Sequence, residues 1–98
     1  MTGTHTNEAS EAATQLAVLA GNLSDRGFAA QLTHAGKCSA VSVVNLWVPQ
    51  LAETVYAAPA GGAWWFWWSW AERIARIGDV EAAAFKIAYV LTPHASVG

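Results

Sequence analysis

The sequence Trp64-Trp65-Phe66-Trp67-Trp68-Ser69-Trp70 decides the fold, because five of the six tryptophans fall within these seven residues. Aromatic side chains bury large apolar areas and favour β-strands. Seven residues suit the length of one strand and are far too few to cross a bilayer. We therefore expect a central strand over residues 64–70, on which the rest of the chain is assembled.

Side chains along a strand point alternately to its two faces. One face of this strand carries Trp64, Phe66, Trp68 and Trp70. The other face carries Trp65, Trp67 and Ser69. The first set is aromatic throughout, so we expect helices to cover it. The second set exposes two tryptophans, which indicates an interface or a ligand platform unless loops or a tail of the same chain cover them.

The composition favours one globular domain that associates with something else. Hydrophobic residues make up 54% of the 98 residues, and charged residues make up only 12%. The charged share is about half of the ~25% found in average globular proteins, and this combination argues against disorder. A single domain over residues 1–98 is expected, with flexible tails over residues 1–6 and 93–98. So few charges leave much of the surface apolar, which favours a homo-oligomer, most simply a dimer, or a protein partner.

Charge and targeting signals exclude several classes of function. The formal net charge is −2, and the five basic residues are scattered, so we expect no nucleic-acid partner. No stretch is long and apolar enough for a membrane span, and the N-terminus lacks the basic and apolar regions of a secretion signal. We therefore predict a cytoplasmic protein that does not bind membranes.

Periodicity predicts the elements that precede the tryptophan strand. Leu16, Leu19 and Leu23 recur at helical spacing and indicate a helix over residues 8–26, with Asn7 as its N-cap. Residues 28–34 alternate like a half-buried strand. A glycine-containing turn follows, and β-branched residues then favour a second strand over residues 38–46.

The remaining elements complete an α+β fold. Residues 51–58 form a third strand that places Tyr56 beside the aromatics, and residues 59–62 form a loop. Residues 71–78 are ambiguous, because Ile74 and Ile77 have helical spacing. Asp79 caps a second helix that ends before Pro93. The prediction is a four-stranded antiparallel meander whose N- and C-terminal helices pack on one face.

The order of these segments resembles a group of small uncharacterised actinobacterial proteins. That group has an acidic L-x-E-x-V strand, a W-x-F-x-W-x-W-G strand and a terminal helix that begins with aspartate. Glu53 and Val55 match the first pattern, and Asp79 matches the start of the helix. The chain departs from the group at Ala71, where the pattern has glycine. The resemblance implies a fold and a source, and it implies no activity.

No pattern of chemically active residues indicates an enzyme. The three histidines are far apart in sequence, and the single cysteine forms no metal motif, so we expect neither a metal nor a cofactor. The sequence favours a non-catalytic interaction module that self-associates or docks a partner through an open aromatic sheet face. The predicted interface or ligand platform consists of Tyr56, Trp65, Trp67 and Ser69. The alternative is a small-molecule-binding module that uses the tryptophan cluster or a pocket between helices and sheet.

Overall fold

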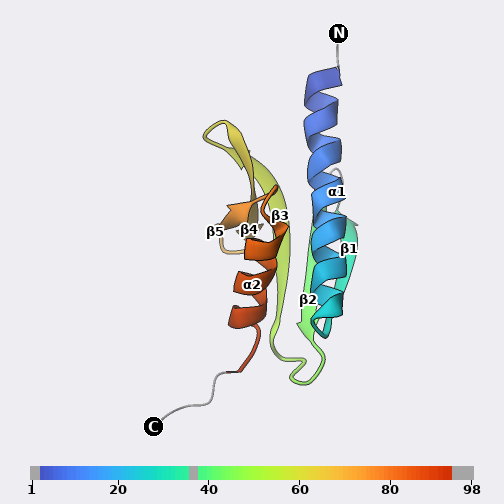
Figure 1. Cartoon of the computed structure of the whole chain (residues 1–98), viewed down its shortest axis with the longest axis vertical. Coiled ribbons are helices and arrows are strands. Elements are labelled where there is room, and N and C mark those ends of the chain that lie inside the picture. The colour runs from blue at the N-terminus through green and yellow to red at the C-terminus, as the bar shows by residue number, and fades with distance from the viewer. Residues whose placement is uncertain (1–2, 36–37, 94–98) are drawn as a thin grey trace.

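The computed structural model describes residues 3–35 and 38–93, and it describes side chains within residues 11–33 and 39–93. Helix α1 (Gly3–Asp25) comes first, and helix α2 (Val80–Val90) comes last. The strands between them are β1 (Phe28–Ala35), β2 (Cys38–Asn45), β3 (Ala52–Ala60), β4 (Ala63–Trp68) and β5 (Arg73–Arg76). They form one antiparallel sheet in the order β1-β2-β3-β4-β5 (Figure 1). The predicted α+β meander is confirmed, with five strands instead of four.

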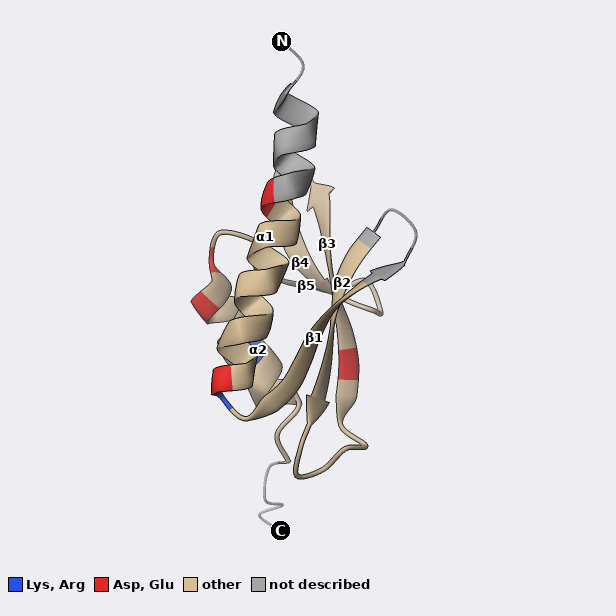
Figure 2. Ribbon diagram, turned by 90° about the vertical axis from the view of Figure 1, so that its right-hand side faces the viewer, with Lys and Arg blue, Asp and Glu red and all other residues tan. Residues whose placement is uncertain are grey.

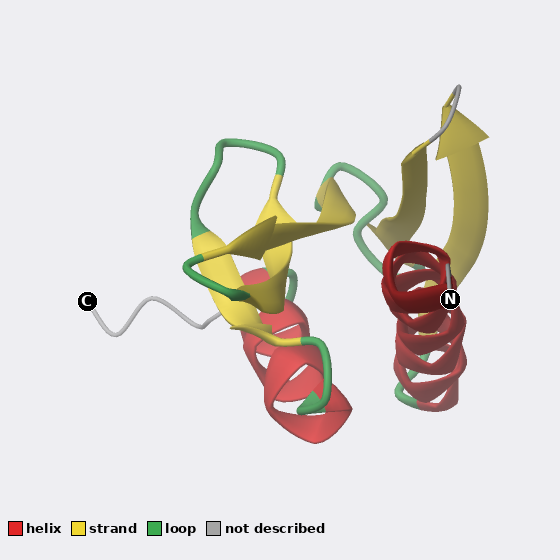
Figure 3. Cartoon of the chain, turned by 90° about the horizontal axis from the view of Figure 1, so that it is seen from above, coloured by secondary structure: helices red, strands yellow, loops and turns green. Residues whose placement is uncertain are grey.

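Both helices lie on the same face of the sheet (Figure 3). Helix α1 packs against β1 and β2, and α2 packs beside β5 and against α1. We call this helix-covered side the inner face and the opposite side the outer face. The arrangement of two helices on one side of an antiparallel sheet is the one that the sequence predicts.

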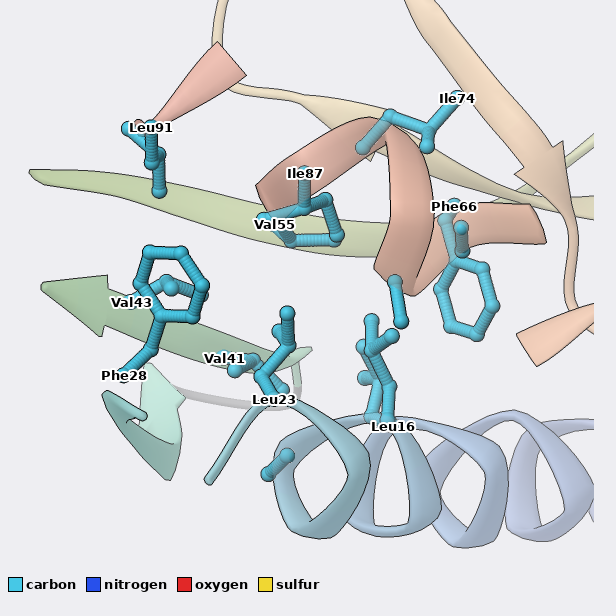
Figure 4. Close-up of a cluster of buried hydrophobic side chains, with 14 of the residues drawn as sticks. Leu16, Leu23, Phe28, Val41, Val43, Val55, Phe66, Ile74, Ile87 and Leu91 are labelled. Carbon is cyan, nitrogen blue, oxygen red and sulfur yellow. The ribbon is translucent and has the colours of Figure 1, made fainter. Parts of the chain in front are cut away.

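The core lies between the inner face and the two helices (Figure 4). Helix α1 contributes Leu16, Leu19 and Leu23, which are fully buried, as their spacing predicts. The sheet and α2 contribute Phe28, Val41, Val43, Val55, Phe66, Trp68, Ile74, Ala83, Ala84, Ile87 and Leu91. Full burial of each large apolar side chain in this set contributes about 1.5–3 kcal/mol to the free energy of folding. This layer is therefore the main stabilising contribution in the fold.

The N-terminal boundary differs from the prediction. Helix α1 begins at Gly3, so residues 3–6 of the expected tail are helical and Asn7 lies inside the helix instead of capping it. Helix α2 begins as expected, because the carboxylate of Asp79 accepts a hydrogen bond of 3.4 Å from the backbone N–H of Ala82. Of the tail expected over residues 93–98, residues 94–98 lie outside the described part of the chain.

The hairpin between β3 and β4 is tighter than predicted. Only Gly61 and Gly62 lie between the paired residues Ala60 and Ala63, and both glycines have positive φ, at +60° and +82°. A two-residue turn of type I′ requires positive φ at both positions, which explains the glycine pair. Pro59 belongs to β3 and pairs with Trp64. It is tolerated because, among the described residues, the β2 pairing of β3 ends at Tyr56.

Strand β4 ends two residues earlier than predicted. Phe66 and Trp68 are buried, and Trp64 is half-buried on the same face. Trp70 was expected there too, but it follows the end of the strand and is 49% exposed. Its ring stacks on Trp68 with centroids 4.8 Å apart and planes 7° from parallel. The turn then continues through Ala71, which has a φ of +68°, a conformation that costs any residue other than glycine.

Strand β5 replaces the ambiguous segment. It pairs with β4 through Trp65 and Arg76, Phe66 and Ala75, and Trp67 and Arg73. Ile74 is the extra residue between the last two pairs, so β5 carries a β-bulge. Ile74 is buried in the core, and this burial explains why the segment forms a strand on the sheet instead of a turn of helix.

Neither α1 nor α2 is long and apolar enough to serve as a membrane-spanning helix, within the residues searched.

Candidate functional site

The register of the strands defines the outer face. One row across the sheet consists of Thr33, Ala40, Tyr56, Trp67 and Arg73. A second row consists of Ala58, Trp65 and Arg76. Three of the four predicted platform residues, Tyr56, Trp65 and Trp67, therefore lie together on the face that the helices leave open. Trp65 and Trp67 are half-buried, and Tyr56 is 39% exposed.

The indole rings of Trp65 and Trp67 are held against β3 by their own N–H groups. Nε1 of Trp65 donates to the carbonyl oxygen of Ala60, and Nε1 of Trp67 donates to that of Ala58, both at 3.1 Å. Each ring is thus fixed at its polar end by the neighbouring strand. A rigid aromatic surface loses little conformational entropy when something packs on it.

Two arginines of β5 lie on these rings. The Cζ atom of Arg73 is 4.7 Å from the centroid of the Trp65 ring and 6.0 Å from that of Trp67. The Cζ atom of Arg76 is 5.5 Å from the Trp65 centroid. These distances are typical of cation–π contacts. We call the group Tyr56, Trp65, Trp67, Arg73 and Arg76 the tryptophan–arginine layer.

The β-bulge is what brings both arginines to this layer. Residues three apart in a regular strand lie on opposite faces, because side chains alternate. With Ile74 as an extra residue, Arg73 pairs with Trp67 while Arg76 pairs with Trp65, so both arginines share the outer face. The sequence analysis treats the basic residues as scattered. The structure shows that two of them lie on the tryptophan rings, and their position depends on the bulge, which no local pattern in the sequence marks.

Ser69 lies apart from the layer. It follows the end of β4, and its hydroxyl donates a 3.3 Å hydrogen bond to Oε1 of Glu53. Glu53 pairs with Val43 and so occupies a position of the inner face. Ser69 therefore stabilises the turn after β4 instead of extending the aromatic platform.

A cavity opens between the start of α2, the start of β4 and strand β5 with the turn that follows it. Its volume is about 760 Å³. Small side chains form much of its wall, Trp64 and Trp65 supply aromatic surface, and Arg76, Asp79 and Lys86 supply charge. The ammonium group of Lys86 is held by the carbonyl oxygen of Ile74 at 3.0 Å. Cavities of roughly 300–1,000 Å³ are the usual size for small-molecule sites.

Sequence reasoning missed two exposed aromatic regions. Phe85 and Tyr89 lie one helical turn apart on α2 and are 63% and 59% exposed, beside a groove of about 380 Å³. Trp47, the sixth tryptophan, is 88% exposed in the loop between β2 and β3. Phe85 and Tyr89 fall outside the apolar stripe that predicts the buried face of α2.

No group of three or more histidine, cysteine, aspartate or glutamate side chains that could hold a metal ion occurs among the described residues. Figure 2 shows how sparsely charged residues are distributed along the described ribbon. Comparison with family models, curated proteins and solved structures gave no match for this chain.

Proposed function

We propose that the chain is a non-catalytic interaction module that docks a partner on the outer face of its sheet. The observation that carries this proposal is the tryptophan–arginine layer, a rigid aromatic and cationic surface on the one side of the sheet that neither helix covers. Aromatic residues and arginine are the side chains most enriched at the energetic centres of protein interfaces. The partner is another protein or a second copy of the chain.

Site-specific photo-crosslinking in cells that produce the chain tests this function. A benzophenone amino acid is placed at Tyr56, on the outer face, or at Val18, on α1. These positions are similarly exposed, at 39% and 49%, so Val18 is a matched control. Crosslinked protein is expected from position 56 and not from position 18. Crosslinks from position 18 alone, or from neither position, would argue against a docking surface on the outer face.

A second candidate function, small-molecule binding, is favoured by the 760 Å³ cavity beside Trp64. A ligand in this cavity would contact the Trp64 indole and change its fluorescence. Titration with a panel of metabolites is the direct measurement. Ala82, which lines the cavity, provides the control, because Ala82→Leu narrows the space from its α2 wall. A response that survives Ala82→Leu unchanged would place the ligand elsewhere.

A further inference from the structure

Among the described residues, the paired positions of the outer face carry charge of one sign only. The positions of β1 to β3 with described side chains that share this face with the tryptophan–arginine layer are Ala29, Gln31, Thr33, Ala40, Ser42, Val44, Ala52, Thr54, Ala58 and Ala60. None of them is charged. Arg73 and Arg76 are therefore the charged residues of the described outer face, and they give it two positive charges on a chain whose net charge is −2.

The two guanidinium groups lie against aromatic rings, and within the part of the chain that the structure describes their N–H groups donate no hydrogen bond. Within the described residues, the interactions of Arg73 and Arg76 side chains are the cation–π contacts with Trp65 and Trp67. The one ion pair among the described residues joins Arg26 to Glu81 and involves neither of these arginines. Stacking occupies the flat face of a guanidinium and leaves its edge N–H groups directed away from the ring. Those N–H groups match a carboxylate in a bidentate geometry.

We infer that the tryptophan–arginine layer binds an acidic, extended protein segment whose carboxylates pair with Arg73 and Arg76. This inference depends on the proposed docking function and names the chemistry of the partner. Both guanidinium groups lie on the Trp65 ring, so they are roughly 10 Å apart or less. Alternate side chains of an extended segment are about 6.8 Å apart, so acidic residues at positions i and i+2 reach both arginines.

Two other occupants fit the layer less well. A second copy docked face to face would bring the two arginines of each subunit together, and like charges across a two-fold interface are repulsive. A nucleic acid requires a basic stripe that neutralises several phosphates. The outer face offers two cations, and its indoles are half-buried with arginines on them, so they present little free ring for bases.

The segment lies across the face instead of extending the sheet at β5. Strand β5 is an edge, but the ammonium group of Lys86 binds the carbonyl oxygen of Ile74 at 3.0 Å. A lysine placed in this way occupies a backbone acceptor that an added strand would use. Recognition is therefore expected to depend on side-chain charge more than on backbone pairing.

Calorimetric and fluorescence titrations of the full chain test this inference. The probe is a ten-residue peptide of alternating glutamate and threonine, and the matched peptide replaces each glutamate with glutamine. The double variant R73Q/R76Q removes both charges, R73K/R76K keeps the charges but loses the bidentate geometry, and R26Q is the control on α1. Circular dichroism checks that every variant is folded.

The glutamate peptide is expected to bind the wild type and to weaken at high salt. Binding should fall about tenfold or more in R73Q/R76Q, fall less in R73K/R76K and stay unchanged in R26Q. Equal binding of the two peptides, or an equal loss in R26Q, overturns the inference. Tighter binding of a ten-nucleotide oligothymidylate would assign the layer to nucleic acid, and a change of molecular mass in R73Q/R76Q by light scattering would assign it to a second copy. If position 56 crosslinks to a protein but the acidic peptide does not bind, the proposed docking function is retained and the inference that the partner is acidic is rejected.

Discussion

The side-chain amide of Asn45 joins the end of β2 to the end of α2 through a 2.7 Å hydrogen bond from its Nδ2 atom to the carbonyl oxygen of Leu91. The Oδ1 atom of the same amide accepts the backbone N–H groups of Trp47 and Val48, at 2.7 and 3.0 Å. Asn45 is 5% exposed and is the one buried polar residue among those described. One amide thus satisfies three backbone groups from two parts of the chain that are 46 residues apart.

Replacing Asn45 with alanine is expected to lower the free energy of unfolding by about 2–4 kcal/mol, because three backbone groups lose their partner, one of them in a buried hydrogen bond. Asn45→Asp should also destabilise, since it keeps the acceptor and loses the donor to Leu91. Urea unfolding measures both effects. Gln50→Ala, in the same exposed loop, is the control and should change stability by less than about 0.5 kcal/mol. A loss in Asn45→Ala no larger than that of the control would contradict the bridging role.

Trp68 and Trp70 form one stack but differ in burial, so their truncations should differ. Trp68 is 5% exposed, and Trp68→Ala is expected to cost about 3–5 kcal/mol through the cavity it leaves. Trp70 is 49% exposed, and Trp70→Ala should cost about 1 kcal/mol, mainly from lost stacking. Thermal and chemical unfolding distinguish the two. Equal losses would mean that both rings belong to the core.

Ala71→Gly is expected to stabilise the protein. Alanine at a φ of +68° is strained by roughly 1–2 kcal/mol, and the extra freedom of glycine in the unfolded chain offsets about 0.5–1 kcal/mol of the relief. The net gain should be about 0.5–1 kcal/mol by urea unfolding. Ala29→Gly, at an exposed position of β1, is the matched control and should destabilise instead. If both substitutions destabilise equally, the turn at Ala71 is not strained.

Replacing either hairpin glycine with alanine should instead destabilise the protein. Gly61→Ala and Gly62→Ala each force a residue with a side chain into positive φ, at a cost of about 1 kcal/mol. No atom lies within 4 Å of a Cβ added at either position, so any loss reports backbone conformation and not a clash. Gly21→Ala, inside α1, is the comparison and should stabilise by about 1 kcal/mol or less. A neutral result at both hairpin positions would contradict the type I′ assignment.

The sequence predicted the parts of the fold that follow a regular period. The leucine stripe of α1 and the alternation of β1 are confirmed, because side chains in helices and strands return to the same face at fixed sequence intervals. The Asp79 cap of α2 is also confirmed, and it depends on residues that are adjacent in sequence. Strand β5 was ambiguous for a physical reason. Its bulge makes residues three apart share a face, and that spacing also indicates a helix. Trp70 was misplaced because nothing in an aromatic run marks where pairing stops.

The candidate site was predicted only in part. Tyr56, Trp65 and Trp67 share the outer face, because side chains alternate along a strand and paired residues of neighbouring strands point to the same side. The arginines could not be assigned to that face, since their position depends on how β5 is bulged against β4. The cavity beside Trp64 depends on where α2 crosses the sheet, and no local pattern encodes that crossing.

The bulge in β5 also corresponds to a residue spacing that can be searched for in genome sequences. Arg73 follows Trp67 by six residues, and the chain therefore carries the spaced signature W-x-W-x(5)-R-x-x-R over residues 65–76. A protein that preserves the two intervals and the bulge should display the same stacked cations even if its helices have diverged, whereas one that carries the same spacing in a regular strand should turn an arginine toward its interior, because residues three apart then lie on opposite faces. Spacing of this kind distinguishes relatives that retained the stacked cations from those that kept only the scaffold.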